Sequence, residues 1–131
     1  MKKVLIISDE QQLLTSLEAS SFSGDFSLHT LPGCEDTLGE ITMMQQDLIL
    51  VDFLLGSING GALCHQIRGH EPIKHLPVIL LSDYPNMQRF SAKFGCNLIV
   101  PKPVEPAQLI ETFSAMLNKK EQQTNFLHKA C

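Results

Sequence analysis

Short apolar runs alternate along this chain with segments of helical periodicity, and this alternation limits the folds that the sequence can adopt. The runs expected to form strands are 1–8, 26–31, 48–51, 77–81 and 98–100. Apolar residues recur every three or four positions in the segments 11–21, 35–45, 60–68, 86–94 and 106–119. Strict alternation of strands and helices predicts a parallel sheet with helices on both faces.

The composition fits one globular domain. The chain has 131 residues, of which 44% are hydrophobic and 18% charged, so it is long and apolar enough to bury a core. We place the domain at residues 1–120 and a polar C-terminal tail or helix extension at 121–131.

Charge and hydropathy exclude several classes of protein. The net charge of −4 argues against direct binding of nucleic acid, because phosphate backbones select basic surfaces. No apolar stretch approaches the roughly 20 residues of a membrane span, and the apolar run Val4–Ile7 is too short for a signal peptide. We therefore predict a cytoplasmic protein that does not enter the membrane. The four cysteines and five histidines lack zinc-site spacing.

Chemically active side chains follow four of the five predicted strands. In a doubly wound sheet, ligands bind beyond the carboxyl ends of the strands. In the strand order 2-1-3-4-5 these four strands are adjacent, so their terminal side chains converge. The side chains are Ser8, Asp9 and Glu10 after the first strand, Asp52 after the third, Ser82 after the fourth and Lys102 after the fifth.

This set of groups suits phosphoryl transfer. Mg²⁺ takes one or two carboxylates, keeps several waters and bridges to phosphate. A carboxylate such as Asp52 can attack phosphorus and form an acyl phosphate, while Lys102 and Mg²⁺ neutralise charge and Ser82 donates a hydrogen bond. Structural interpretations stay open as well: Ser8 and Gln11 fit a capping box, and Asp9 and Ser82 fit a helix cap and a turn.

Four segments carry a family resemblance: VLIISDE, LILVDFLLGSINGG, VILLSD and IVPKP, in this order and at these distances. The chain resembles the response-regulator receiver domain of two-component signalling from Lys2 to about Lys119. The resemblance implies a (βα)5 flavodoxin-like fold, a doubly wound three-layer sandwich with five parallel strands in the order 2-1-3-4-5. It also implies that a histidine kinase or phosphotransfer protein donates a phosphoryl group with Mg²⁺, and that a conformational change reaches a downstream protein partner.

Matched by position, the resemblance assigns the site residues. Asp52 is the phosphoacceptor, Ser82 the switch hydroxyl and Lys102 the phosphate-binding lysine ahead of a cis proline. Mg²⁺ would be held by Asp9, Asp52 and the backbone carbonyl of Leu54, with Glu10 as a candidate further ligand. Such a domain is not a turnover enzyme, since its only reactions are self-phosphorylation and slow autodephosphorylation.

The chain departs from the family pattern at several positions, among them Leu55-Gly56, where family members commonly have Met-Pro. Ser8 replaces the first acid of the acidic pair, Asp83 replaces the small residue after the switch hydroxyl, and Ile99 replaces an aromatic switch residue. The alternative is therefore a degenerate pseudo-receiver, an interaction module that works without phosphorylation. A Mg²⁺-dependent hydrolase is disfavoured, because Leu54 stands where its second acid would be. The sequence does not identify the cognate kinase or the output. It also leaves the oligomeric state open, with a homodimer as one option.

Overall fold

The computed structural model describes residues 2–20, 26–31, 37–55 and 59–117. Its five strands form one parallel sheet in the order β2-β1-β3-β4-β5, which confirms the predicted topology. The strands are β1 (Lys2–Ile7), β2 (Phe26–Leu31), β3 (Leu48–Asp52), β4 (Val78–Ser82) and β5 (Leu98–Pro101). The helices are α1 (Gln11–Ser20), α2 (Thr37–Met44), α3 (Gly60–Arg68), the 3₁₀-helix η2 (Gln88–Phe90), α4 (Ser91–Phe94) and a helical segment at 106–117.

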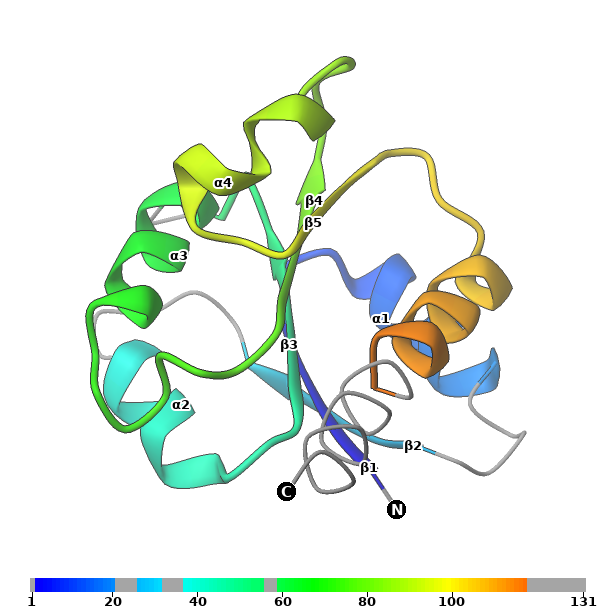
Figure 1. Cartoon of the computed structure of the whole chain (residues 1–131). Helices are drawn as coiled ribbons and strands as arrows, with labels where there is room; N and C mark the ends of the chain where they lie inside the picture. Colours follow the sequence, from blue (N-terminus) through cyan, green and yellow to red (C-terminus); the bar gives the residue numbers. More distant parts are fainter. Residues whose placement is uncertain (1, 21–25, 32–36, 56–58, 118–131) are drawn as a thin grey trace, which may run out of the picture.

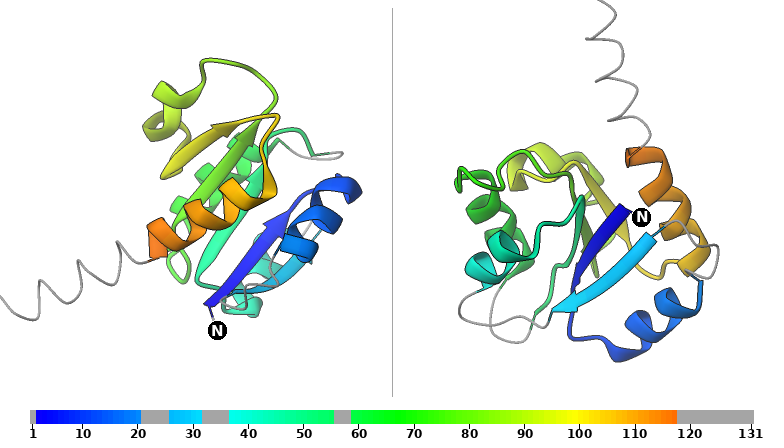
Figure 2. Two further views of the ribbon diagram at one scale, coloured as in Figure 1. Left: turned by 90° about the vertical axis from the view of Figure 1, so that its right-hand side faces the viewer. Right: turned by 90° about the horizontal axis from the view of Figure 1, so that it is seen from below.

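The helices cover the sheet in two layers. α2 and α3 lie on one face, while α1 and the segment 106–117 lie on the other (Figures 1 and 2). Every residue of β3 and β4 is buried, as expected for central parallel strands covered on both sides. The predicted three-layer sandwich is therefore the observed architecture.

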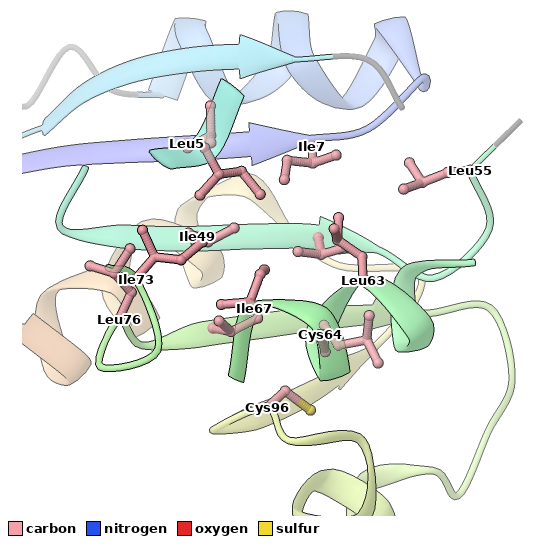
Figure 3. Close-up of a cluster of buried hydrophobic side chains, with 14 of the residues drawn as sticks. Leu5, Ile7, Ile49, Leu55, Leu63, Cys64, Ile67, Ile73, Leu76 and Cys96 are labelled. Atoms are coloured by element: carbon pink, nitrogen blue, oxygen red, sulfur yellow. The ribbon is translucent and has the colours of Figure 1, made fainter. Parts of the chain in front are cut away.

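Each face of the sheet has its own apolar core. Figure 3 shows the core beneath α2 and α3, where side chains such as Ile49 and Ile67 meet between the sheet and the helices. The opposite core joins α1 to the segment 106–117, and in it Phe113 packs edge-on against Phe26 with ring centroids 5.9 Å apart. The helical periodicity of the sequence therefore marks the buried face of α1, α2, α3 and the segment 106–117 correctly.

One predicted helix differs from the structure. Asn86 has a positive φ of 64° that a right-handed helix does not accommodate, so the helical part begins only at Gln88. It is then divided into η2 and the four-residue α4 at Phe90, whose φ of −97° and ψ of 10° depart from helical values. The predicted domain end at residue 120 and the tail 121–131 lie outside the described residues. In the described ranges, no helix combines the length and apolarity that crossing a membrane requires.

Candidate functional site

Strand register brings the predicted side chains to one edge of the sheet. Ile7 pairs with Val51, Asp52 with Leu81, and Ser82 with Pro101. Because the strands are parallel, their carboxyl ends meet at this edge. Ser8, Asp52, Ser82 and Lys102 therefore end up on neighbouring strands, as the sequence predicts.

Asp52 is the buried centre of this cluster. Its side chain is 3% exposed, and Lys102 Nζ lies 2.8 Å from Oδ1. Oδ2 accepts two hydrogen bonds, from Lys102 Nζ at 3.0 Å and from Ser8 Oγ at 3.1 Å. Oδ1 is buried and accepts no hydrogen bond of good geometry, so one carboxylate oxygen retains acceptor capacity for a further group.

Three carboxylates surround the ammonium of Lys102. Besides Asp52, Nζ donates to Glu10 Oε2 at 3.1 Å and lies 3.3 Å from Asp83 Oδ1. Burial lowers the pKa of Lys102, but the hydrogen bonds to Asp52 and Glu10 outweigh this effect, so the pKa is raised above its usual value. The Lys102–Pro103 peptide bond is cis, as the resemblance implies.

The hydroxyl of Ser82 is bound within its own loop. Ser82 is fully buried, and Oγ accepts from Tyr84 N at 3.0 Å. Its proton can go to the Tyr84 carbonyl at 2.9 Å or to Met87 Sδ at 3.1 Å. The position of Ser82 in the strand matches the prediction, but its hydroxyl has to turn before it can reach a group bound to Asp52.

Ser8 has a different role from the one that a capping box predicts. α1 begins at Gln11, where Glu10 O accepts the hydrogen bond of Leu14 N, which is later than a Ser8 cap requires. Ser8 is buried, donates to Asp52, and accepts from Glu10 N at 3.0 Å. The capping-box interpretation is therefore wrong, and Ser8 belongs to the site itself.

Two glycines after β3 hold the site together through close packing. A Cβ on Gly60 would overlap the carbonyl oxygen of Asp52, and a Cβ on Gly61 would lie 2.7 Å from Phe94 Cδ1. Asn59 caps α3, since its Oδ1 accepts from Gly61 N at 2.7 Å and from Ala62 N at 3.2 Å. These close contacts hold the start of α3 against β3.

The chemistry of the cluster fits a divalent cation. Asp9 and Glu10 are exposed at the end of β1, next to buried Ser8. Three carboxylates, on Glu10, Asp52 and Asp83, contact one ammonium at this edge, and the free acceptor capacity of Asp52 Oδ1 suits a hard cation. Within the described ranges, no three His, Cys, Asp or Glu residues are grouped as metal ligands, so main-chain oxygen and water would complete the set.

A cavity of about 410 Å³ opens beside the cluster. Glu10, Asp83 and Lys102 form its polar wall, and residues of α1 and of the segment 103–106 form the rest. Asp52 itself does not line this cavity, but Lys102, which contacts Asp52, does.

A five-stranded doubly wound sheet, with an aspartate and a lysine meeting at its carboxyl edge, defines a chemotaxis-receiver-like α/β domain. The sequence model of the response regulator receiver domain matches residues 4–114. The chain therefore belongs to the response regulator receiver family of two-component signalling, which confirms the resemblance drawn from its four motifs.

Curated relatives agree with this family. The chain is 30% identical over 128 residues to the response regulator ArlR of Staphylococcus saprophyticus, covering 94% of this chain and 56% of that protein. It is 24% identical over 127 residues to the sensory transduction protein BceR of Halalkalibacterium halodurans, covering 95% and 54%. The chain spans about half the length of the curated relatives that it matches.

Solved structures show the same fold. A putative response regulator from Chloroflexus aurantiacus superposes with a TM-score of 0.79 at 25% identity, covering 89% of this chain and 98% of that one. The receiver domain of a sensor histidine kinase from Pseudomonas aeruginosa, described with a magnesium ion in its active-site cleft, gives 0.76 at 20% identity, covering 89% and 98%.

Proposed function

We propose that Asp52 accepts a phosphoryl group from a histidine kinase or phosphotransfer protein. The observation that carries this proposal is the Asp52 carboxylate, 3% exposed and 2.8 Å from Lys102 Nζ, with an oxygen that accepts no hydrogen bond. In the transfer, a carboxylate oxygen bonds to phosphorus, the bond from phosphorus to the donor's imidazole nitrogen breaks, and that nitrogen keeps the electron pair. Lys102 offsets the charge on the phosphoryl oxygens.

Mg²⁺ is the proposed cofactor. Asp9, Asp52 and the main-chain carbonyl of Leu54 would hold it, and Glu10 is a further candidate because its carboxylate already lies at this edge. When bound, the cation supplies positive charge against the phosphoryl oxygens. Ser82 is the proposed hydroxyl that donates to one of those oxygens after leaving its bonds with Tyr84 and Met87.

We propose that packed aromatic side chains transmit the phosphorylation state of Asp52 to the surface near α4. The ring of Phe53, the residue after the acceptor, packs edge-on against Tyr84 and Phe94, with both pairs of centroids 5.9 Å apart. Rotation of Ser82 towards a phosphoryl group would release the loop that carries Tyr84. These three aromatic rings would connect Asp52 to α4. They would take the part of the family's aromatic switch residue, which is replaced here by the buried Ile99.

The first test is phosphorylation by a small donor. We expect acetyl phosphate with Mg²⁺ to give a hydroxylamine-labile adduct of one phosphoryl group per chain, seen by intact-mass spectrometry. Asp52→Asn should show no adduct, because the amide cannot form the acyl phosphate. Amide spectra should show that the variant is folded. No adduct on the wild type, or an equal adduct on the folded variant, contradicts the proposal.

The second candidate function is a pseudo-receiver that binds a partner without phosphorylation. Ser8 favours it, because a hydroxyl occupies a position where the family has a metal-binding acid. A Mg²⁺ titration followed by the amide signals of Asp9 and Asp52 separates the two functions. Binding at millimolar concentration or tighter supports the phosphorylated receiver, whereas no response supports the pseudo-receiver.

Replacing Ser8 with aspartate should strengthen the metal site. The new carboxylate would replace the hydroxyl that now donates to Asp52 at 3.1 Å, so two acids would repel each other until a cation binds. We expect Ser8→Asp to tighten Mg²⁺ binding about tenfold, as one added ion pair would, measured by calorimetry. Ser8→Asn is the uncharged control of the same shape, and equal affinities for both variants would contradict the placement of Mg²⁺ beside Ser8.

The cellular setting is proposed on the same basis. A phosphorylatable receiver meets its kinase in the cytoplasm, and the net charge of −4 favours a protein partner over nucleic acid. We propose residues 1–120 as the receiver and 121–131 as an appended polar segment. A downstream protein would read the state of α4 and β5.

A further inference from the structure

Asp83 occupies a position from which it can affect an incoming phosphoryl group. Its carboxylate lies 3.3 Å from Lys102 Nζ, and its side chain is 33% exposed. Lys102 Nζ also contacts Asp52, so the two acids share one ammonium. A phosphoryl group on Asp52 would bring further negative charge to the same ammonium.

Asp83 is the most weakly bound of the three acids around Lys102. Nζ donates hydrogen bonds to Asp52 Oδ2 at 3.0 Å and to Glu10 Oε2 at 3.1 Å, while its contact with Asp83 is an ion pair at a longer distance. Asp83 is therefore the carboxylate that an entering anion displaces at the lowest cost.

The loop that holds Asp83 against Lys102 also holds the Ser82 hydroxyl away from Asp52. Ser82 Oγ accepts from Tyr84 N at 3.0 Å and lies 2.9 Å from Tyr84 O, which closes a tight turn around Asp83. When Ser82 rotates towards a phosphoryl group, this turn loses its bracing hydrogen bonds. The same rearrangement would move the Ser82 hydroxyl towards the phosphoryl group and let the Asp83 carboxylate move away from Lys102.

We propose that Asp83 competes with the phosphoryl group for Lys102, so that phosphorylation of Asp52 requires the Asp83 carboxylate to leave the ammonium. The inference rests on the proposed function and deepens it: Asp83 is a positioning residue that slows entry of anionic donors. Small anionic donors would therefore phosphorylate Asp52, but more slowly than they would without the Asp83 carboxylate beside Lys102.

The test compares two donors of different charge on the full chain with Mg²⁺. Removing one negative charge should speed the reaction of the doubly charged acetyl phosphate about fivefold. The singly charged phosphoramidate, with half the electrostatic effect, should gain about twofold. The variants are Asp83→Asn and Asp83→Ala. The matched control is Glu71→Gln, which removes the same charge from a surface ion pair with Lys74.

Both gains should shrink towards one in 1 M salt, where the Debye length is about 3 Å. A purely structural effect of the substitutions would change the phosphorylation rate equally for both donors and would not depend on salt concentration. Equal gains for the two donors, no gain for either, or the same gain in Glu71→Gln would overturn the proposal.

Binding of inorganic phosphate separates this inference from the proposed function. With Mg²⁺ at pH 8, the amide signals of Ser82 and Lys102 report the anion without any covalent step. We expect Asp83→Asn to bind phosphate about fivefold more tightly than the wild type. If neither the wild type nor the variant forms a phosphoryl adduct, the proposed function fails. The ratio of their phosphate affinities still tests the role of Asp83. An affinity of Asp83→Asn equal to or below that of the wild type overturns the role proposed for Asp83.

Discussion

Lys102→Met is expected to lower the free energy of unfolding by about 3 kcal/mol at pH 7 without Mg²⁺. The substitution leaves Asp52, whose side chain is 3% exposed, without its ion pair with Lys102. A buried charge that loses its partner typically costs about 3–5 kcal/mol, and the 20% exposure of Lys102 places this site at the lower end. Urea denaturation measures the change.

The matched control is Lys74→Met. Lys74 and Glu71 form an exposed pair at 2.8 Å, with side-chain exposures of 53% and 80%. Exposed pairs of this kind contribute about 0–1 kcal/mol, so this variant should unfold at nearly the same urea concentration as the wild type. Equal losses in the two variants would contradict a stabilising role for the Lys102 cluster.

The pH dependence of the Lys102→Met effect follows from the sign of the pKa shift. The pKa of Lys102 is raised in the folded chain, so the folded state favours the charged form. Its contribution is fully present below the ordinary lysine pKa of about 10.4 and is lost as pH rises through the higher folded-state value. The stability difference between wild type and variant should be equal at pH 7 and 9.

Gly60→Ala is expected to destabilise the fold by about 3 kcal/mol. The added Cβ would overlap the Asp52 carbonyl oxygen and lie 2.8 Å from Phe53 Cα. Both contacts are with backbone, so no side chain can rotate away, and overpacking of this kind costs about 1–3 kcal/mol or more. Thermal or urea unfolding measures the loss.

Gly69→Ala supplies the control for Gly60→Ala. A Cβ on Gly69 would meet its nearest atom, His65 O, at an ordinary 3.6 Å, and Gly69 has a φ of −89° that alanine adopts freely. Its stability should stay within about 0.5 kcal/mol of the wild type. Similar losses in both variants would show that Gly60 is not a close-packing position.

Much of the fold is encoded in local patterns that can be recognised without a structure. α3 begins and ends at the predicted residues, Gly60 and Arg68, because apolar periodicity and the Asn59 cap act locally. Continuous apolar runs also identify β3 and β4, since both strands are buried on two faces. The late start of η2 at Gln88 does not follow from the sequence, because the positive φ of Asn86 depends on the path of the whole loop.

The site could be predicted only as far as strand order determines it. Parallel register places Asp52 and Lys102 together, and the sequence anticipates that. Contacts between side chains depend on rotamers and loop paths, so the bond from Ser8 to Asp52 and the pair between Asp83 and Lys102 were not foreseen. The adjacent pair Gly60-Gly61 at a helix start was the available signal for close packing against β3.

The most direct test of the central claim is to locate the phosphoryl group on the chain. Borohydride reduces an aspartyl phosphate to homoserine. The chain is treated with acetyl phosphate and Mg²⁺, reduced and digested, and mass spectrometry of the peptides then finds the residue that became homoserine. The account predicts homoserine at position 52 and at no other aspartate. Homoserine at Asp9 or Asp83, or at no position while a control receiver is modified, would contradict it.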